Sequence, residues 1–308
     1  MTSDITVFHY NVLANPLRTK YMFPHVPCIT NDQANEALKA ILSIQCNRGA
    51  IICLQEITQT MRCMLHVWFE ERSYRVVATN TGNSYNGYMG TLIAYPEHMQ
   101  LKTLQIGKPS TLMGNRPDDT LTTWDTLCVW ARRTFHKFGI CEAPKPTPYD
   151  LICRRWNDLI ILRLKNGDQF WNIGTYHMPC LHWAPEAQNL HCMAINKAFC
   201  AMNINSEPQI LTIDGNYKPD TLPHKTMLNK WQVVDHSAPY TCMSQSNRPN
   251  NEPFYPLTID YIYYRNASES HSHYQQAMDM FNPSDYAHPS EQNPSDHLYL
   301  SACFEAFN

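Results

Sequence analysis

The sequence PSDHLYLSACF occupies residues 294–304, close to the end of the 308-residue chain. It places Asp296 and His297 directly before apolar residues that alternate with polar or small ones, which is typical of a β-strand with one buried face. In isolation, such polar residues usually form a turn into the strand. Their meaning therefore depends on what the ends of the other predicted strands carry.

Short β-rich runs recur along the whole chain. The continuous apolar run of residues 50–57 predicts a strand that is covered on both faces. Further strands are predicted at residues 5–14, 74–79, 90–96, 159–164, 170–178, 209–214, 257–265 and 297–304.

Two stretches have the apolar spacing of a helix. Residues 31–45 are predicted to form one that is capped at Asn31 or Asp32, and residues 184–203 form another with Pro185 in its first turn. Many strands with few helices predict a strand-rich α/β or α+β domain, in which two sheets pack together with helices outside.

The bulk composition indicates a globular protein, since 44% of the residues are apolar and 17% are charged. A net charge of −3 argues against a uniformly basic surface. The chain has no apolar run near the ~18 residues that a membrane span needs. We expect no membrane association. No stable protein partner can be inferred from the sequence.

Twelve cysteines are spread along the chain, and no two have C-x-x-C spacing. Together with an N-terminus that lacks a secretory pattern, this favours free thiols in a cytoplasmic or other reducing intracellular compartment. The fragment HMPCLH, residues 177–182, resembles a soft-metal site, but no second Cys/His pair at zinc-finger spacing accompanies it.

Residues 105–156 match the strand pattern least well and are predicted to form a variable insertion. Between Lys102 and Lys165, eleven Lys and Arg residues oppose six Asp and Glu residues, so this segment is basic in an acidic chain. It also contains several large aromatic residues, among them Trp124, Trp130, Phe135 and Trp156. Such a segment suits a polyanion with stackable bases, although an ordinary solvated face with a few core aromatics is the alternative.

Six predicted strands carry an amide, a carboxylate or an imidazole at one end. These residues are Asn11, Glu56, His177, Asp214 with Asn216 two positions later, Asp260, and the pair Asp296 and His297. One such residue is usually a turn former, but six favour convergence on one rim of the sheets. The set is rich in oxygen ligands and has no thiolate, which suits Mg²⁺ or Mn²⁺ better than zinc.

Six short motifs are spread over almost the whole chain. They are HYNVLA (9–14), CLQEI (53–57), TYHMP (175–179), IDGNYKPD (213–220), LTIDYIYY (257–264) and PSDHLYL (294–300). In this order they resemble the endonuclease/exonuclease/phosphatase superfamily, which has the DNase I-like fold. The chain looks most like the branch that contains nocturnin, the poly(A)-removing deadenylases and the 2′-phosphodiesterases.

The resemblance implies a single domain over residues 1–308, with two packed, mostly antiparallel sheets between helices in a four-layered α/β sandwich. It implies that Glu56 is the principal metal ligand, that Asn11 lies at the metal, and that Asp296 completes the metal site. It also implies that Asn157 lies near the substrate phosphate.

The resemblance implies a catalytic role for five further residues. Asp214 would orient or deprotonate the attacking water, and Asn216 would hold that water or a phosphate oxygen. His177 would contact the phosphate. Asp260 would pair with His297 and keep that imidazole oriented and charged.

The function that this resemblance implies is Mg²⁺-dependent hydrolysis of phosphodiester bonds in RNA by metal-assisted attack of water. The enzyme would be a 3′-end exoribonuclease or a 2′-5′ oligoadenylate phosphodiesterase. One alternative is a phosphatase or phosphodiesterase for an inositol phosphate, a lipid headgroup or a nucleotide cofactor. Another is a catalytically inactive binding module of the same fold.

Overall fold

The computed structural model of the protein describes residues 4–113, 146–204, 206–235, 240–245, 254–272, 289 and 293–307. Three aromatic residues of the predicted insertion, Trp124, Trp130 and Phe135, lie outside these ranges. In the described part, ten cysteines are free thiols, and no helix is both long and apolar enough to cross a membrane.

Most described strands belong to two six-stranded sheets. The first sheet contains β1 (Ile5–Asn11), β2 (Ile51–Ile57), β3 (Tyr74–Ala78), β4 (Gly90–Pro96), β13 (Ala267–Ser272) and β14 (Leu300–Ala306), in the order β13-β14-β1-β2-β4-β3. The second contains β5 (Gln100–Gly107), β6 (Leu159–Asn166), β7 (Gln169–His177), β8 (Gln209–Asp214), β9 (Gln232–Val233) and β12 (Asp260–Arg265), in the order β5-β6-β7-β8-β12-β9. A separate ribbon pairs β10 (Cys242–Gln245) with β11 (Phe254–Leu257).

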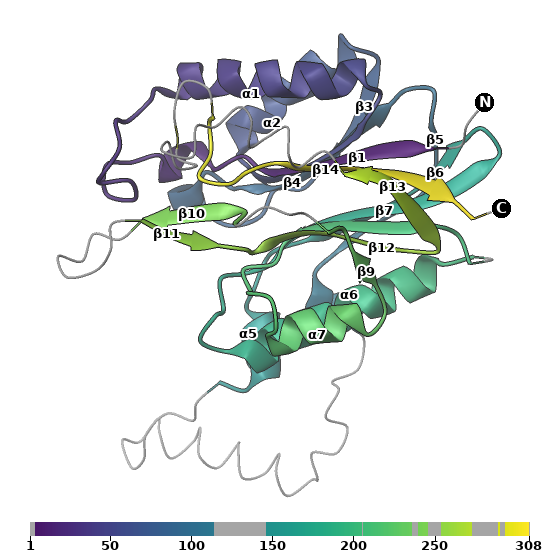
Figure 1. The fold of residues 1–308 in the computed structure, drawn as a ribbon. Coiled ribbons are helices and arrows are strands. Elements are labelled where there is room, and N and C mark those ends of the chain that lie inside the picture. The colour runs from purple at the N-terminus through teal and green to yellow at the C-terminus, as the bar shows by residue number, and fades with distance from the viewer. Residues whose placement is uncertain are drawn as a thin grey trace, which may run out of the picture.

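Helices cover the outer faces of both sheets. The described helices are α1 (Asn31–Asn47), α2 (Gln59–Glu70), α3 (Pro109–Leu112), α5 (Pro148–Cys153), α6 (Pro185–Met202) and α7 (Leu222–Leu228), with short 3-10 turns at Asn15–Leu17 and Ser84–Asn86. In Figure 1, α1 and α2 lie outside the first sheet, and α5, α6 and α7 lie outside the second. The four layers confirm the predicted sandwich of two mostly antiparallel sheets.

The main core lies between the two sheets. Because successive strand residues point to opposite faces, β1 sends Ile5 and Val7 into this core and Phe8 and Tyr10 toward the helices. Asn11 follows Val7 by four residues, so its side chain also points between the sheets. A polar residue at the end of β1 is thereby aimed at the second sheet.

Each sheet contains one parallel pair of strands, and its other pairs are antiparallel. In the first sheet β1 runs parallel to β2, with α1 between them in the chain. In the second sheet β7 runs parallel to β8, with α6 between them. Since parallel strands end at the same edge, Asn11 and Glu56 lie at one edge of the first sheet, and His177 lies opposite Asp214 at the edge of the second sheet that faces it.

Both predicted helices are present. The helix over residues 31–45 is α1, but its cap is Thr30, whose side chain forms a reciprocal capping box with Gln33. The helix over residues 184–203 is α6, which begins at Pro185.

Three predicted strand boundaries are wrong. The strand predicted at residues 5–14 ends at Asn11. The run at 257–265 is two strands, because Leu257 ends β11 and Asp260 begins β12. Asp260 still lies at the site edge, since β12 is antiparallel to β8 and pairs Asp260 with Asp214. The last strand begins at Leu300, while His297 forms an isolated bridge with Cys242.

The described ends of segment 105–156 are more regular than predicted. Residues 105–107 complete β5, and α3 and α5 follow within the described part of the segment. Pro109 and Pro148 each occupy the first turn of a short helix, where a missing amide proton costs nothing. In the described ends of the segment, proline therefore marks the start of a helix.

Candidate active site

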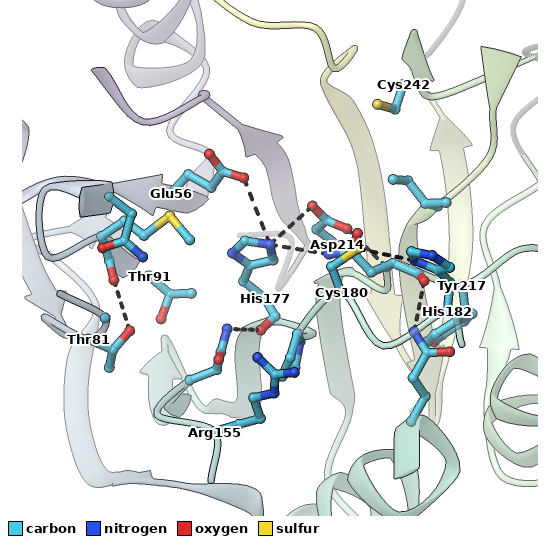
Figure 2. Close-up of a pocket in the computed structure, with 18 of the residues that line it drawn as sticks. Glu56, Thr81, Thr91, Arg155, His177, Cys180, His182, Asp214, Tyr217 and Cys242 are labelled. Atoms are coloured by element: carbon cyan, nitrogen blue, oxygen red, sulfur yellow. Dashed lines mark hydrogen bonds and ion pairs between the residues drawn. The ribbon is translucent and has the colours of Figure 1, made fainter. Parts of the chain in front are cut away.

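A cleft of about 1160 Å³ opens where the polar strand ends of the two sheets meet (Figure 2). Seven of the nine predicted site residues line it, namely Glu56, Asn157, His177, Asp214, Asn216, Asp296 and His297. Asn11 and Asp260 are fully buried and contact these residues from behind. The structure therefore brings together side chains that are up to 286 positions apart, from Asn11 to His297.

Glu56 reaches the cleft because it is the extra residue of a β-bulge. Gln55 pairs with Thr91 and Ile57 pairs with Gly90, so Glu56 has no partner in β4. Its φ of 60° is in the left-handed region, a conformation that costs of order 1–2 kcal/mol for a residue with a side chain. A backbone strained in this way is characteristic of a functional position.

The carboxylate of Glu56 is held by two donors. Its Oε2 accepts a hydrogen bond from the backbone N–H of Ala14 at 3.0 Å, and its Oε1 accepts one from Asn11 Nδ2 at 3.1 Å. Both donors come from the end of β1 and the loop after it. The orientation of Glu56 is therefore fixed by the neighbouring parallel strand.

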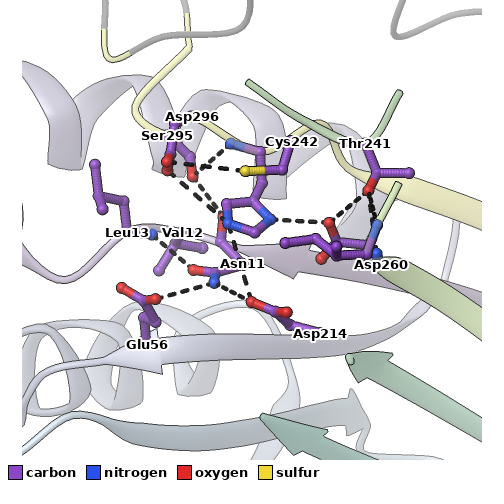
Figure 3. Close-up of polar contacts among 12 residues, drawn as sticks. Asn11, Val12, Leu13, Glu56, Asp214, Thr241, Cys242, Asp260, Ser295 and Asp296 are labelled. Carbon is purple, nitrogen blue, oxygen red and sulfur yellow. Dashed lines mark hydrogen bonds and ion pairs between the residues drawn. The ribbon is translucent and has the colours of Figure 1, made fainter. Parts of the chain in front are cut away.

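Asn11 joins carboxylates of the two sheets (Figure 3). Its Oδ1 accepts a hydrogen bond from Leu13 N–H at 3.1 Å, which fixes the direction of the amide. Its Nδ2 donates to Glu56 Oε1 at 3.1 Å and to Asp214 Oδ2 at 2.8 Å. The amide nitrogen, and not the oxygen, thus faces the carboxylates, so this geometry suits an orienting role for Asn11 better than a ligand role.

Asp214 is the most enclosed carboxylate on the cleft, with 1% of its surface exposed. Its Oδ1 accepts a hydrogen bond from Asn216 N–H at 3.0 Å, and its Oδ2 lies 3.6 Å from His177 Nε2 and 3.9 Å from His297 Nε2. Burial raises the pKa of Asp214, and the negative charge of Asp260 raises it further. A carboxylate with a raised pKa is a better proton acceptor near neutral pH.

Asn216 turns back toward the cleft through a left-handed φ of 47°, which asparagine adopts more easily than most residues. Its Nδ2 donates to the carbonyl oxygen of Met178 at 2.8 Å and lies 3.3 Å from His177 Nε2. Asn157 Nδ2 donates to the carbonyl oxygen of His177 at 2.9 Å. Two amide side chains thus fix the backbone around His177.

Asp260 and His297 form a buried ion pair. His297 Nδ1 donates to Asp260 Oδ2 at 2.9 Å, and the hydroxyl of Thr241 donates to the same oxygen at 2.8 Å. Burial opposes the charge on both groups, but their mutual attraction outweighs it. The pKa of Asp260 is therefore lowered and that of His297 is raised well above its ordinary value. His297 consequently presents a cationic imidazole to the cleft.

His9 is a site residue that the sequence analysis missed. It is fully buried, and its Nε2 donates to Asp260 Oδ1 at 3.1 Å. Its Nδ1 has no hydrogen-bond partner among the described residues. The signal for it was present, because His9 is two positions before Asn11 and so shares the strand face that points between the sheets.

Two further residues tie the ends of the chain together at the site. The hydroxyl of Ser295 donates a hydrogen bond to the carbonyl oxygen of Asn11 at 2.7 Å and accepts one from His297 N–H at 3.1 Å. The guanidinium of Arg18, which the sequence analysis missed, donates to the carbonyl oxygens of Leu13 at 2.8 Å and Pro294 at 2.9 Å. The loops after β1 and before β14 are thereby locked side by side.

The carboxylate oxygens of Glu56 and Asp296 at the cleft suit a hard divalent cation. The buried Oδ1 of Asp296 has no hydrogen-bond partner among the described residues. Burial raises the pKa of Asp296 to about 6; the charge of His297 opposes this shift and that of Glu56 adds to it. A cation at this point would relieve the repulsion, and carboxylate oxygens are the ligands that Mg²⁺ and Mn²⁺ prefer.

Comparisons with known proteins place this geometry in a structural context. No family model matches the sequence, and no curated protein matches it. ANGEL2, a 2′,3′-cyclic phosphatase solved with adenosine-2′,3′-vanadate, is similar in structure at 15% identity and a TM-score of 0.68, over 98% of this chain and 95% of that chain. The catalytic domain of human nocturnin with bound sulfate is similar at 15% identity and a TM-score of 0.65, over 99% and 95%.

An endonuclease/exonuclease/phosphatase from Bacteroides vulgatus is similar at 11% identity and a TM-score of 0.64, over 99% of both chains. These likenesses cover almost the whole chain, including every strand that contributes to the cleft. The chain therefore has the fold of the endonuclease/exonuclease/phosphatase superfamily, as the order of its motifs predicts.

Proposed function

We propose that this protein is a metal-dependent phosphoesterase that hydrolyses phosphodiester bonds in RNA. The observation that carries this proposal is the buried Asp214 carboxylate, which lies between two imidazoles at the base of the cleft and shares Asn11 with Glu56. Such a cluster combines a proton acceptor, the cationic imidazole of His297, a second imidazole and oxygen ligands around one open space. Phosphodiester hydrolysis by water needs these groups and no covalent nucleophile.

Glu56 and Asp296 would hold the cation, with Asn11 keeping Glu56 in place. When bound, Mg²⁺ or Mn²⁺ would neutralise part of the negative charge that makes a phosphodiester a poor electrophile. Glu56 lies in the bulge of β2 and Asp296 in the loop before β14. Arg18 and Ser295 fix that loop against the end of β1 and the loop after it, and this second loop holds Glu56 through Ala14 N–H.

Asp214 would orient the attacking water and accept its proton. The N–H of Asn216 holds Oδ1 and the amide of Asn11 holds Oδ2, so the carboxylate has a fixed direction. Its raised pKa favours proton uptake as the oxygen–phosphorus bond forms. The amide of Asn216 would steady the water or a phosphate oxygen.

His297 and His177 would stabilise the charge that develops on the phosphate oxygens. The ion pair with Asp260 keeps His297 charged, and its Nε2 faces the carboxylate of Asp214 at 3.9 Å. Removing one fixed donor of this kind typically lowers turnover by about 10²- to 10³-fold.

The rim of the cleft favours an oligonucleotide over an inositol phosphate or a lipid headgroup. Trp156 lines the cleft with 61% of its surface exposed, and Arg154 and Arg155 line it beside the tryptophan. Lys108 Nζ lies 5.2 Å from the centre of the Trp156 ring. Aromatic faces next to cations suit bases and phosphates of a single strand. Asn157, which follows Trp156, would then lie near the substrate phosphate.

A terminal cyclic phosphate is a second candidate substrate. The likeness to ANGEL2, which was solved with adenosine-2′,3′-vanadate, favours it. A cleft of about 1160 Å³ is also large enough for a mononucleotide.

One substrate panel separates these candidates. The protein is incubated with 5′-labelled 3′-5′ oligoadenylate, 2′-5′ oligoadenylate, adenosine 2′,3′-cyclic phosphate and an inositol phosphate, each with Mg²⁺, Mn²⁺ or EDTA. We expect an oligoadenylate to be shortened with metal and left intact with EDTA. If neither oligoadenylate is cut while another compound is hydrolysed, the RNA assignment is wrong.

A further inference from the structure

Cys242 lies in the cleft and has no part in the proposed hydrolysis. It begins β10, lines the cleft and is 4% exposed. It forms an isolated antiparallel bridge with His297, and directly opposed residues of such a pair project to the same side. Hydrolysis by water requires no thiol, so this residue needs another explanation.

The thiol of Cys242 is close to two other potential ligands. Its Sγ lies 4.0 Å from Asp296 Oδ2, and Figure 3 shows these two side chains together. His297 Nε2 lies 4.0 Å from Asp296 Oδ1. One ligand atom from each of the three residues lies within 4.8 Å of the others. Sulfur, oxygen and nitrogen ligands in this arrangement suit a different metal from the all-oxygen set.

We propose that Cys242, Asp296 and His297 form a binding site for a thiophilic divalent cation, Zn²⁺ or Cd²⁺, and that occupation of this site stops the hydrolysis. Zinc binds thiolate sulfur at about 2.3 Å and imidazole nitrogen or carboxylate oxygen at about 2.0 Å. A tetrahedral site then needs ligand atoms somewhat closer than 4.0 Å, which small side-chain rotations provide. The inhibitory part of this inference rests on the proposed function, whereas the binding part does not.

His297 is oriented for this second role. Its Nδ1 donates to Asp260, so its Nε2 is the ring nitrogen available to a metal. A carboxylate behind a ligating histidine is the usual support for a zinc ligand.

Cation binding would release protons. The S–H bond of Cys242 and the Nε2–H bond of His297 break, the metal–ligand bonds form, and both protons pass to solvent.

Occupation would disable the hydrolytic site in two ways. The carboxylate of Asp296 would bind the thiophilic cation and would no longer be available as a ligand for Mg²⁺ or Mn²⁺. Occupation would also engage Nε2 of His297, the nitrogen that faces Asp214 at 3.9 Å, so this nitrogen could no longer donate to a phosphate oxygen. A thiophilic cation would therefore inhibit even when Mg²⁺ is in excess.

Cys180 provides a matched control. Cys180 also lines the cleft, and its Sγ lies 3.4 Å from His182 Nδ1. These two residues offer a thiophilic cation two ligands, compared with three at Cys242, Asp296 and His297. Cys180 is exposed, whereas Cys242 is buried beside two further ligands. A third ligand is what separates a strong site from a weak one.

The binding test is a Cd²⁺ titration of the full-length protein, followed by the near-ultraviolet thiolate-to-metal absorption band. We expect wild type and Cys180→Ser to bind Cd²⁺ equally well, and Cys242→Ser to bind it at least about tenfold more weakly with a smaller band. Thermal unfolding confirms that both variants are folded. Equal binding by Cys242→Ser, or a loss in Cys180→Ser instead, overturns the site.

The inhibition test measures hydrolysis of the best substrate at fixed Mg²⁺ with increasing Zn²⁺. We expect Cys242→Ser to remain active and to need at least about tenfold more Zn²⁺ for half-inhibition. Equal inhibition of wild type and Cys242→Ser overturns the inhibitory role. If no substrate is hydrolysed by either protein while the Cd²⁺ band depends on Cys242, the binding site stands and the proposed function fails.

Discussion

The carboxylate of Asp260 is held by three side chains in a position without solvent access. His297 and Thr241 donate to one oxygen, and His9 donates to the other. A buried carboxylate with an unsatisfied oxygen would be costly, and it would be free to rotate away from His297. His9 is therefore a positioning residue that acts on the cleft through Asp260.

Replacing His9 tests this role, because the substitution removes the hydrogen bond from His9 Nε2 to Asp260 Oδ1. We expect His9→Leu to lower kcat by about 10- to 100-fold with little change in KM, because Asp260 loses a donor and His297 is less well oriented. His9→Gln, whose amide can still donate, should recover most of the loss. Steady-state kinetics on both variants, with unfolding curves, provide the measurement. A purely structural role predicts that both variants lose stability and neither changes kcat.

Trp156 offers a test of substrate contact at the rim. We expect Trp156→Ala to raise KM for an oligonucleotide about tenfold, because stacking on one base is worth about 1–3 kcal/mol, while Trp156→Phe retains most of the affinity. The control is Trp183→Ala, since Trp183 is similarly exposed at 60% but does not line the cleft. If both alanine variants behave alike, stacking on Trp156 is excluded.

At the scale of elements, α6 is attached to β7 by a buried polar contact. The hydroxyl of Tyr176 and Nδ1 of His191 lie 2.9 Å apart, and both residues are buried. Burial, aided by the charge of Arg155, lowers the pKa of His191 from 6.5 to about 3. The folded protein therefore keeps His191 neutral at a pH where the unfolded chain protonates it.

This contact predicts a pH dependence of stability. Between pH 6.5 and about 3 the unfolded state binds one more proton at His191, so the free energy of unfolding falls as the pH falls. We expect this histidine to contribute up to about 1.4 kcal/mol per pH unit, and His191→Gln to remove that contribution. Urea unfolding at several pH values measures the slope. His66→Gln, which changes an exposed histidine, should leave the slope unchanged; an unchanged slope in His191→Gln contradicts the assignment.

Apolar periodicity predicts most of the elements that carry the site. It predicts β1, β2, β7 and β8 and both long helices, because their buried faces are regular in sequence. It does not predict that Asp260 begins β12, since only the pairing of β12 with β8 places that residue at the site edge. The bulge at Glu56 is also invisible, because its left-handed φ arises where β2 meets β4.

The residues missed at the site share one cause. His9 contacts a residue 251 positions away and Arg18 contacts one 276 positions away, so no local pattern identifies the partner of either residue. Eight of the nine predicted site residues are visible as polar residues at strand ends, whereas Asn157 is predicted only because the motifs occur in the order of a known superfamily. The two parallel strand pairs bring four of these residues together, and the antiparallel pairing of β12 with β8 adds Asp260.

At the scale of the whole molecule, a chain with a net charge of −3 has a cleft with cationic groups at its rim. Arg155 lies beside His177 in Figure 2 and lines the cleft. If Arg155 contacts a substrate phosphate, removing its guanidinium should weaken oligonucleotide binding and should also make the binding affinity less dependent on salt.

We expect Arg155→Ala to reduce the slope of log affinity against log salt by about 0.7, the value for one phosphate contact of a single strand. Arg75→Ala is the control, because Arg75 is exposed on β3, pairs with Glu97 and does not line the cleft. Binding titrations in the absence of divalent cations give the slopes. An unchanged slope in Arg155→Ala excludes this contact.

The proposed hydrolysis of phosphoesters, with Asp214 orienting and deprotonating the attacking water, is tested most directly with bis(p-nitrophenyl) phosphate and Mn²⁺. This substrate requires no correct base or sugar. We expect turnover by the wild-type protein that EDTA abolishes, and a loss of about 10²- to 10⁴-fold in Asp214→Asn at unchanged thermal stability. Turnover by Asp214→Asn at the wild-type rate would contradict the role of Asp214. A wild-type protein that hydrolyses nothing would contradict the proposed activity and favour an inactive binding module.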